Sequence, residues 1–434
     1  MPKPLVAIVG RPNVGKSTLF NKLVGKRIAI VEDRPGVTRD RIYSEVEWLN
    51  NKFILIDTGG LEPSNKEELF LKVKKQVEIA IDMAHLIIFL VDGKEGLNPI
   101  DREIANILRK TDKKILLVCN KVDNKKDMDM IYDFYGLGFD EIIPISAALG
   151  LGIGDLLDKI IENLPQTLED GYEDDVIKIA VIGRPNVGKS SLVNKILGEE
   201  RVIVSDIPGT TRDAIDTYFE KEDNKYVLID TAGLRRKSKI YDDIEKYSVI
   251  RALTAIDRSD VCLVIIDAKE GVTEQDKRIA GYALEQKKAI IILVNKWDLI
   301  EKDNNTYNEF LKNIRLELDF IDFAPVIFIS AKTGQRVNRV LESVNNVYFE
   351  YSKRISTGLL NDVINQSILL NPPPSGLKIY YITQIDIKPP TFTIFVDDPE
   401  KLHFSYMRFL ENEIRKSFGF DGAPFKFIIR KKTD

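Results

Sequence analysis

The chain has 434 residues, with 63 Lys and Arg against 67 Asp and Glu and a net charge of −4. This length predicts about three domains, and the acidic balance argues against a protein whose whole surface binds nucleic acid. Two cysteines and two histidines exclude a disulfide framework and argue against a Cys/His zinc site. No apolar run reaches the length of a membrane-spanning helix or a secretory signal. We therefore expect a cytoplasmic, multidomain protein that contacts no membrane.

The chain contains an internal repeat. Residues 10–25 read GRPNVGKSTLFNKLVG and residues 183–198 read GRPNVGKSSLVNKILG, with twelve of sixteen positions identical at an offset of 173. A repeat this long indicates a duplicated domain rather than a solenoid. Five acidic residues fall within 169–175 and predict a flexible linker. We therefore expect a first domain at 1–165, an acidic linker at 166–175, a second domain at 176–352 and a C-terminal domain at 353–434.

Within each copy, short apolar runs alternate with amphipathic segments. In chain order, the runs of the first copy are LVAIVG, KFILIDT, HLIIFLVD, KILLVCN and EIIPIS, and the segment 64–84 between the second and third has helical periodicity. Continuous apolar runs are typical of strands that are covered on both faces. The pattern predicts an α/β fold with a doubly wound, mostly parallel sheet in each copy.

A glycine-rich segment between the first strand and the first helix predicts a phosphate-binding loop in each copy. Gly10 and Gly15 permit a tight turn whose N–H groups face phosphate oxygens, and the helix N-terminus adds its positive end. Lys16 can reach the β- and γ-phosphates, and the Ser17 hydroxyl can ligate Mg²⁺. An ordinary Gly-rich turn is the alternative, but the motif occurs twice in register. The expected nucleotide contacts are Gly10, Arg11, Pro12, Asn13, Val14, Gly15, Lys16, Ser17 and Thr18, and Gly183, Arg184, Pro185, Asn186, Val187, Gly188, Lys189, Ser190 and Ser191.

A second motif predicts guanine as the base. An Asn-Lys-x-Asp sequence ends the fourth predicted strand, and its carboxylate can accept both the ring N–H and the exocyclic amine of guanine, donors that adenine does not offer together. The Lys stem can cover a base face, and the Asn can support the loop. A Ser-Ala pair after the next strand could present a backbone N–H to the guanine oxygen. These residues are Asn120, Lys121, Asp123, Ser146 and Ala147 in the first copy, and Asn295, Lys296, Asp298, Ser330 and Ala331 in the second.

Two further positions in each copy are expected to read the γ-phosphate. Thr38 and Thr211 follow a Pro-Gly turn and could bring a hydroxyl to Mg²⁺, while Asp57 and Asp230 end strands and would hold Mg²⁺ through water. The backbone N–H of a nearby glycine would contact the γ-phosphate. The predicted magnesium ligands are Ser17, Thr38 and Asp57, and Ser190, Thr211 and Asp230. The residues expected to act on the reacting phosphate are Lys16, Thr38, Gly60, Lys189, Thr211 and Gly233.

Together these motifs resemble the translation-factor-type, Ras-like GTPase fold, present twice. The tandem layout with GRPNVGKS, TRD, DTGG, DTAG and NKxD closely resembles the Der (EngA) family of bacterial ribosome-assembly GTPases, and residues 378–432 are similar to that family's C-terminal KH-like domain. The fold class implied is α/β, with two Ras-like P-loop GTPase domains in tandem followed by a small α+β KH-like domain. The resemblance implies a GTPase that binds GTP, GDP and Mg²⁺ and assists maturation of the large ribosomal subunit through its rRNA. We expect a monomer that binds no DNA.

One departure concerns catalysis. The residue after DxxG, often a Gln that orients the attacking water, is Leu61 in one copy and Leu234 in the other. An aliphatic side chain cannot orient water, so a partner or another group must supply the missing charge. In related GTPases, an Asn at the position of Asn13 and Asn186 ligates potassium where an arginine finger would sit. The resemblance therefore implies a potassium site at both residues, and the alternative is that they only shape the loop.

The C-terminal segment is expected to form helix, strand, strand, helix and strand, with a core of its own. From Lys401 to the end, eight Lys and Arg stand against four Asp and Glu, which favours contact with RNA. The sequence Gly419-Phe420-Asp421-Gly422 matches the GxxG letters of a KH domain but lies between a helix and a strand, so a helix C-cap and turn is favoured. A second basic cluster at 235–239 is either a solvated face or a nucleotide-controlled contact with the C-terminal domain or RNA.

Two other functions remain possible from the residues. One is a nucleotide-gated RNA-binding scaffold in which hydrolysis only resets the protein. The other is a GTPase that serves RNA modification, although no modification domain or catalytic cysteine motif is visible.

Overall fold

The computed structural model describes residues 3–25, 43–57, 66–165, 172–173, 175–198, 203–204, 216–222, 224–231, 245–374 and 376–432. The chain divides into two compact units, Met1–Glu169 and Asp170–Asp434. The first unit contains the first copy of the duplicated domain. The second unit contains the second copy together with the C-terminal domain.

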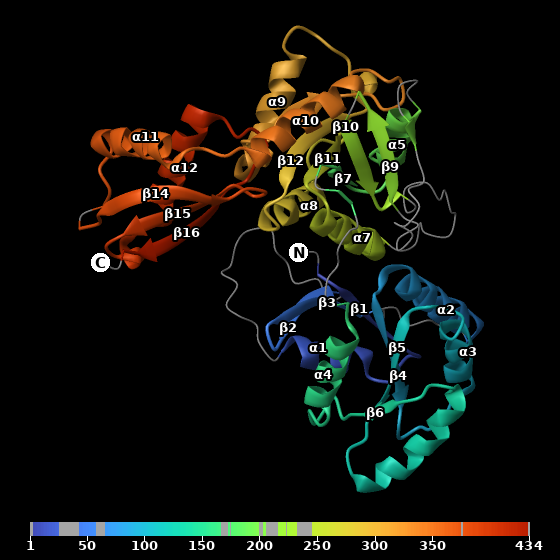
Figure 1. Cartoon of the computed structure of the whole chain (residues 1–434). Coiled ribbons are helices and arrows are strands. Elements are labelled where there is room, and N and C mark those ends of the chain that lie inside the picture. The colour runs from blue at the N-terminus through green and yellow to red at the C-terminus, as the bar shows by residue number, and fades with distance from the viewer. Residues whose placement is uncertain are drawn as a thin grey trace. The chain divides into compact units, whose positions relative to one another are not determined.

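In the first unit, the described residues form a six-stranded sheet with the order β2-β3-β1-β4-β5-β6. Helices α1 and α4 lie on one side of this sheet and α2 and α3 on the other (Figure 1). The strands are β1 Leu5–Val9, β2 Tyr43–Trp48, β3 Asn51–Asp57, β4 Leu86–Asp92, β5 Lys114–Asn120 and β6 Ile142–Pro144. The helices are α1 Lys16–Val24, α2 Lys66–Met83, α3 Pro99–Leu108 and α4 Ile153–Asn163, with a 3₁₀ segment η1 at Lys125–Leu137.

In the second copy, the described residues form a seven-stranded sheet with the order β13-β12-β11-β7-β10-β9-β8. The strands are β7 Ile177–Ile182, β8 Ile203–Val204, β9 Thr217–Lys221, β10 Asn224–Ile229, β11 Val261–Asp267, β12 Ala289–Asn295 and β13 Val326–Phe328. The helices are α5 Lys189–Leu197, α7 Glu245–Arg258, α8 Glu274–Glu285, α9 Thr306–Glu317 and α10 Asn338–Ser352, with 3₁₀ turns η2 Trp297–Leu299 and η3 Asp319–Ile321.

Both sheets are mostly parallel, as predicted, and the fold class is confirmed as α/β. The central strands β1 and β4 are buried along their whole length because helices cover both faces. The exceptions are β2 and β9, which run antiparallel to β3 and β10. Strand β2 is absent from the runs predicted for the first copy because polar residues interrupt it, as in YSEVEW, so it forms no continuous apolar run.

The C-terminal domain is a three-stranded sheet, ordered β14-β15-β16, with two helices. Its elements are α11 Thr357–Leu370, β14 Ile379–Asp386, β15 Thr391–Val396, η4 Pro399–Lys401, α12 Phe404–Phe418 and β16 Lys426–Lys431, in the predicted order of helix, strand, strand, helix and strand. Strand β14 is antiparallel to β15, and β16 is parallel to it. Helices α11 and α12 contact one another, and α11 also contacts β14.

The expected separate core of the C-terminal domain is not found. A single cluster of buried side chains runs from β12 through α10 to α11, α12 and β15. The Ile290 N–H, at the start of β12, donates to the Gly422 carbonyl oxygen at 2.8 Å, and the Gly422 N–H donates to the Phe323 carbonyl oxygen at 2.9 Å. The C-terminal domain therefore shares the core of the second copy instead of enclosing one of its own.

Two further findings concern the cysteines and the apolar character of the helices. Cys119 and Cys262 are both buried and unpaired, and burial raises the pKa of each thiol to about 12. Within the described ranges, none of the helices has both the length and the apolar composition needed to cross a bilayer.

Candidate functional site

The two phosphate-binding loops have the same backbone shape. Gly15 precedes α1 with φ 96° and Gly188 precedes α5 with φ 102°, both in the left-handed region. A Cβ atom on Gly15 would lie 2.4 Å from Asn120 Nδ2, and one on Gly188 would lie 2.2 Å from Asn295 Nδ2. Glycine is therefore required here by backbone conformation and by the close approach of the base-binding strand.

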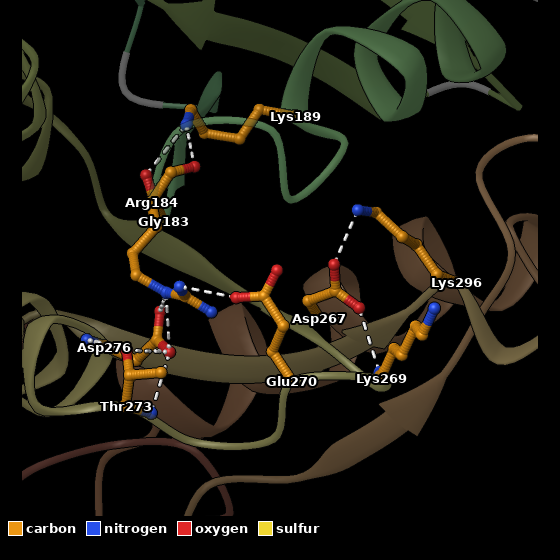
Figure 2. A network of polar contacts seen from close by, with 9 residues as sticks. All are labelled: Gly183, Arg184, Lys189, Asp267, Lys269, Glu270, Thr273, Asp276 and Lys296. Carbon is orange, nitrogen blue, oxygen red and sulfur yellow. Dashed lines mark hydrogen bonds and ion pairs between the residues drawn. The ribbon is translucent and has the colours of Figure 1, made fainter. Parts of the chain in front are cut away.

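The loop lysines fold back over the loops. Lys16 Nζ donates to the carbonyl oxygens of Gly10 at 2.7 Å and Arg11 at 2.8 Å. Figure 2 shows the same arrangement in the second copy, where Lys189 Nζ donates to Gly183 at 2.8 Å and to Arg184 at 2.6 Å. Burial lowers the pKa of each lysine to about 8. An anionic group in the loop would favour the charged ammonium form again.

Two predicted magnesium ligands meet in the first copy. Ser17 Oγ, at the start of α1, donates to Asp57 Oδ2, at the end of β3, at 2.7 Å. Asp57 is buried. Hydroxyl and carboxylate oxygens are hard ligands suited to Mg²⁺. In the second copy, Ser190 lies at the start of α5, and the Asp230 N–H donates to Asp216 Oδ1 at 2.9 Å.

The asparagines of the predicted base sites connect three loops. Asn120 Nδ2 donates to the Val14 carbonyl at 2.8 Å, and Asn120 Oδ1 accepts from the Ala147 N–H at 2.9 Å. Asn295 repeats both bonds in the second copy, with Val187 at 2.7 Å and Ala331 at 2.9 Å. Each asparagine therefore joins the phosphate loop to the Ser-Ala loop, as its predicted supporting role requires. The N–H groups of these two alanines are engaged by asparagine in this conformation.

The two carboxylates of the base sites differ in their contacts. Asp123 accepts from Ser146 Oγ at 2.7 Å and from Lys94 Nζ at 2.6 Å. Hydrogen bonds from Lys94 and then Ser146 hold the pKa of Asp123 below its usual value. Asp298 Oδ1 is buried and has no hydrogen-bond partner. A buried carboxylate oxygen without a partner favours a ligand that donates hydrogen bonds.

Sequence reasoning missed an aspartate that holds the base-site lysine. Lys121 Nζ lies 2.5 Å from Asp92 Oδ2, and Lys296 Nζ lies 2.5 Å from Asp267 Oδ2 (Figure 2). Burial alone would raise the pKa of Asp92, but its hydrogen bond with Lys121 keeps that pKa below the usual value. The signal was present in the sequence, because Asp92 and Asp267 end apolar runs and recur at the offset of 175.

Sequence reasoning also missed the partners of the loop arginines. Arg184 Nε lies 3.1 Å from both carboxylate oxygens of Asp276, and its Nη1 lies 2.8 Å from Glu270 Oε2 (Figure 2). Arg11 forms the equivalent pairs with Asp101 at 3.4 Å and Glu95 at 2.5 Å. The arginine side chains thus tie the phosphate loops to α3 and α8.

Asp101 and Asp276 are also the third residues of α3 and α8, and each closes a capping box. Asp276 Oδ2 accepts from the Thr273 N–H at 3.0 Å. The two capping sequences, NPID and TEQD, recur at an offset of 175 and could have been found by self-comparison.

Asn13 and Asn186 lie in the left-handed region, with φ 67° and 61°. Asn tolerates this conformation better than most residues. The backbone conformation is therefore a sufficient reason for Asn at this position, and a role in binding a metal ion is not needed to explain it. Several predicted residues lie outside the described part of the chain, namely Thr38, Gly60, Thr211 and Gly233, the leucines Leu61 and Leu234, and the basic cluster at 235–239.

Comparison with known proteins gives matches over the whole chain. A family model described as 50S ribosome-binding GTPase matches residues 5–121 and again residues 178–296. A model described as the C-terminal KH-domain-like domain of EngA bacterial GTPase enzymes matches residues 354–430. GTPase Der of Caldanaerobacter subterraneus subsp. tengcongensis is 64% identical, with 100% of both chains covered. GTPase Der of Thermoanaerobacter pseudethanolicus is 64% identical over 99% of both chains, and that of Alkaliphilus oremlandii is 59% identical over 100% of this chain and 99% of the relative.

Proposed function

Because the chain belongs to the GTPase Der family, and is therefore a GTPase, we propose that both copies of its duplicated domain bind GTP and Mg²⁺ and hydrolyse GTP, and that the protein acts as a switch in assembly of the large ribosomal subunit. The observation that carries the two-site proposal is the repeated arrangement of Lys16 and Asn120 in one copy and Lys189 and Asn295 in the other. The ribosomal part rests on the 50S ribosome-binding description of the matching family.

The residues of each site have separate roles in this proposal. The lysine binds the β- and γ-phosphates, the asparagine holds the loops, and the aspartate of NKxD accepts from guanine. Ser17 and Asp57, with Thr38, would hold Mg²⁺, as would Ser190, Asp230 and Thr211. Bound Mg²⁺ would neutralise charge on the phosphate oxygens. Gly60 and Gly233 would contact the γ-phosphate through their N–H groups.

We further propose that the protein works in the cytoplasm as a monomer and contacts large-subunit rRNA. The proposed domains remain 1–165, 176–352 and 353–434, joined by the acidic linker at 166–175. The Gly419–Gly422 turn would not grip RNA, because Gly419 caps α12 and both backbone groups of Gly422 bond to the second copy. RNA contact by the C-terminal domain would therefore use its basic residues outside that turn.

The test is co-sedimentation with large ribosomal subunits in the presence of a non-hydrolysable GTP analogue or GDP, combined with GTP turnover with and without subunits. A switch should bind subunits differently in the two nucleotide states, and subunits should accelerate turnover. A scaffold whose hydrolysis only resets it would bind RNA, while subunits would leave its turnover unchanged. The absence of any association with subunits would overturn the ribosomal proposal.

The potassium proposal has its own measurement. We expect GTP hydrolysis to be faster in potassium than in sodium at constant ionic strength. An arginine finger accelerates hydrolysis by roughly 10³-fold or more, and the effect of potassium should be smaller. Asn13→Gly and Asn186→Gly keep the left-handed backbone and remove the side-chain oxygen. If these variants retained the potassium response, the asparagines would only shape the loop. Equal rates of the wild type in the two salts would exclude the cation mechanism.

A further inference from the structure

A cleft in the first copy lies outside the nucleotide site. Helices α2 and α3 lie side by side (Figure 1) and border a cavity of about 590 Å³. We name this cavity the basic cleft. It is lined by Lys74, Glu103, Asn106, Ile107, Arg109 and Lys110.

The basic cleft has three cations and one carboxylate on a protein whose net charge is −4. Lys74, Arg109 and Lys110 are all exposed. Lys74 Nζ lies 4.0 Å from Glu78, and Arg109 Nη2 donates to Asn106 at 2.6 Å. The Lys110 ammonium forms no ion pair with any residue that the structure describes. The cleft therefore has donors and positive charge available for an anionic partner.

The second copy lacks this charge. The helix caps Asn98 and Thr273 set the register of α3 and α8 at an offset of 175. At that offset the cleft positions are occupied by Val249, Arg278, Gly281, Tyr282, Leu284 and Glu285, with one cation and one carboxylate. The second copy has the same fold and the same nucleotide motifs without this positive charge. Neither the fold nor the nucleotide motifs therefore require the charge. The charge is therefore specific to the first copy.

Both walls of the cleft are linked to the nucleotide site of the first copy. Helix α2 begins at Lys66, six residues after Gly60 in the segment predicted to read the γ-phosphate. Helix α3 is held at its first turn by the pair between Asp101 and Arg11 of the phosphate loop. A change of nucleotide can therefore alter the separation of the walls.

We propose that the basic cleft binds the phosphate backbone of RNA, and that the nucleotide in the first copy controls this binding. The inference rests on the proposed ribosomal function, which supplies RNA as the polyanion. The two lysines, the arginine and the Asn106 amide of the basic cleft can donate hydrogen bonds to phosphate oxygens. Contacts of this kind bind the backbone and do not distinguish one base from another. An acidic protein segment would meet the same charge, and the experiment includes it as an alternative.

The experiment measures fluorescence anisotropy of a labelled oligouridylate with the full chain, bound to a GTP analogue or to GDP, over a range of salt concentrations. The test variant is Lys74→Gln, Arg109→Gln and Lys110→Gln together. The matched control removes the same charge from exposed cations of the second unit, by Lys312→Gln, Arg336→Gln and Arg339→Gln. Labelled polyglutamate is the second probe.

The test variant should bind oligouridylate roughly tenfold or more weakly, and the slope of log K against log salt should fall by about 2, since each single-strand phosphate contact contributes about 0.7. The control should keep the wild-type slope, and wild-type affinity should differ between the GTP analogue and GDP. Unchanged binding by the test variant, equal affinity in both nucleotide states, or a loss confined to polyglutamate would each overturn the proposal. Co-sedimentation of the wild type with large subunits is scored separately, so failure of the ribosomal function and failure of the cleft are distinguishable.

Discussion

At the scale of single residues, the two carboxylates expected to read guanine have different neighbours. Asp123 is held by Ser146 and Lys94, whereas Asp298 Oδ1 is buried without a partner. In the first copy guanine would share carboxylate oxygens that already accept one hydrogen bond each, whereas in the second copy it would satisfy an oxygen that has no partner. The two predicted base sites therefore differ in the hydrogen bonds of their carboxylates before nucleotide binds, although their motifs match.

Asp298→Asn should weaken GTP binding at the second site by about 2 kcal/mol, or roughly 30-fold, because it replaces a charged acceptor with an amide. The first site supplies the internal control, since its affinity should not change. Fluorescent GDP titration of the variant should show one weakened and one normal site. Xanthosine diphosphate should regain part of the affinity, because its base has an acceptor where guanine has a donor. A variant with two normal sites would contradict the assignment of this carboxylate.

The buried loop lysines predict how nucleotide binding depends on pH. Burial lowers the pKa of Lys16 and Lys189 to about 8, and phosphate binding requires the charged form. Binding above that pKa must therefore take up a proton, so GDP affinity should fall as pH rises, by roughly tenfold between about pH 7 and 9. Calorimetry in buffers with different ionisation enthalpies would measure the proton uptake. Lys189→Gln should remove it at the second site, and a pH-independent wild-type affinity would contradict the mechanism.

At the scale of elements, an arginine joins the phosphate loop of each copy to the first turn of a helix, which is α3 in the first copy and α8 in the second. Arg184 pairs with Asp276, which also closes the capping box of α8 with Thr273 (Figure 2). The Asp276 side chain is buried and its partner nearly so, whereas Glu270 is 58% exposed. Arg184 therefore pairs with one buried carboxylate, Asp276, and with one exposed carboxylate, Glu270.

Asp276→Ala should lower the free energy of unfolding of the second unit by roughly 3 kcal/mol, since it removes the cap and leaves the nearly buried Arg184 guanidinium with only the exposed Glu270 as a charged partner. Glu270→Ala is the matched control and should cost less than about 1 kcal/mol, because exposed ion pairs contribute little. Urea unfolding of both variants without nucleotide would measure the difference. Equal losses in the two variants would show that the buried pair is not the anchor of the loop.

At the scale of the whole molecule, the C-terminal domain and the second copy form one compact unit with a shared core. Phe420 is fully buried, and its N–H donates to Glu350 Oε2 of α10 at 2.6 Å. Tyr351 Oη donates to the Lys287 carbonyl at 2.7 Å, between α10 and the residues before β12. Since β12 ends at Asn295, the C-terminal domain is packed against the strand that carries the second base site.

Phe420→Ala should destabilise this unit as a whole by roughly 3–5 kcal/mol, the usual cost of truncating a buried phenylalanine. The chain has two tryptophans, Trp48 in the first unit and Trp297 in the second, so each reports its own unit. In a Trp48→Phe background, the Trp297 fluorescence transition should shift to lower denaturant as one cooperative step. In a Trp297→Phe background, the Trp48 transition should stay in place. A Trp297 transition that Phe420→Ala left unchanged would mean that the C-terminal domain unfolds independently.

The duplication and the fold class could be predicted from the sequence alone, and so could the places in the chain where phosphate and base sites are expected. These features depend on local patterns, because a glycine turn between a strand and a helix, or a polar motif at a strand end, acts through residues near one another in the chain. The C-terminal elements follow from the same kind of local signal. The polar-interrupted strand β2 does not, since it is placed by its pairing with β3 rather than by its apolar content.

The pairing of charged groups and the sharing of cores could not be predicted from the sequence and are known from the three-dimensional structure. Arg184 and Asp276 are 92 residues apart, and Ile290 and Gly422 are still further apart, so no local pattern relates them. The GxxG letters at 419–422 are compatible with either a nucleic-acid grip or a turn, and the backbone bonds to Ile290 and Phe323 decide for the turn. The unequal contacts of Asp123 and Asp298 arise in the same way. Lys269 and Ser330 stand where the first copy has Lys94 and Ser146, so the two carboxylates differ in side-chain conformation, which a local motif does not fix.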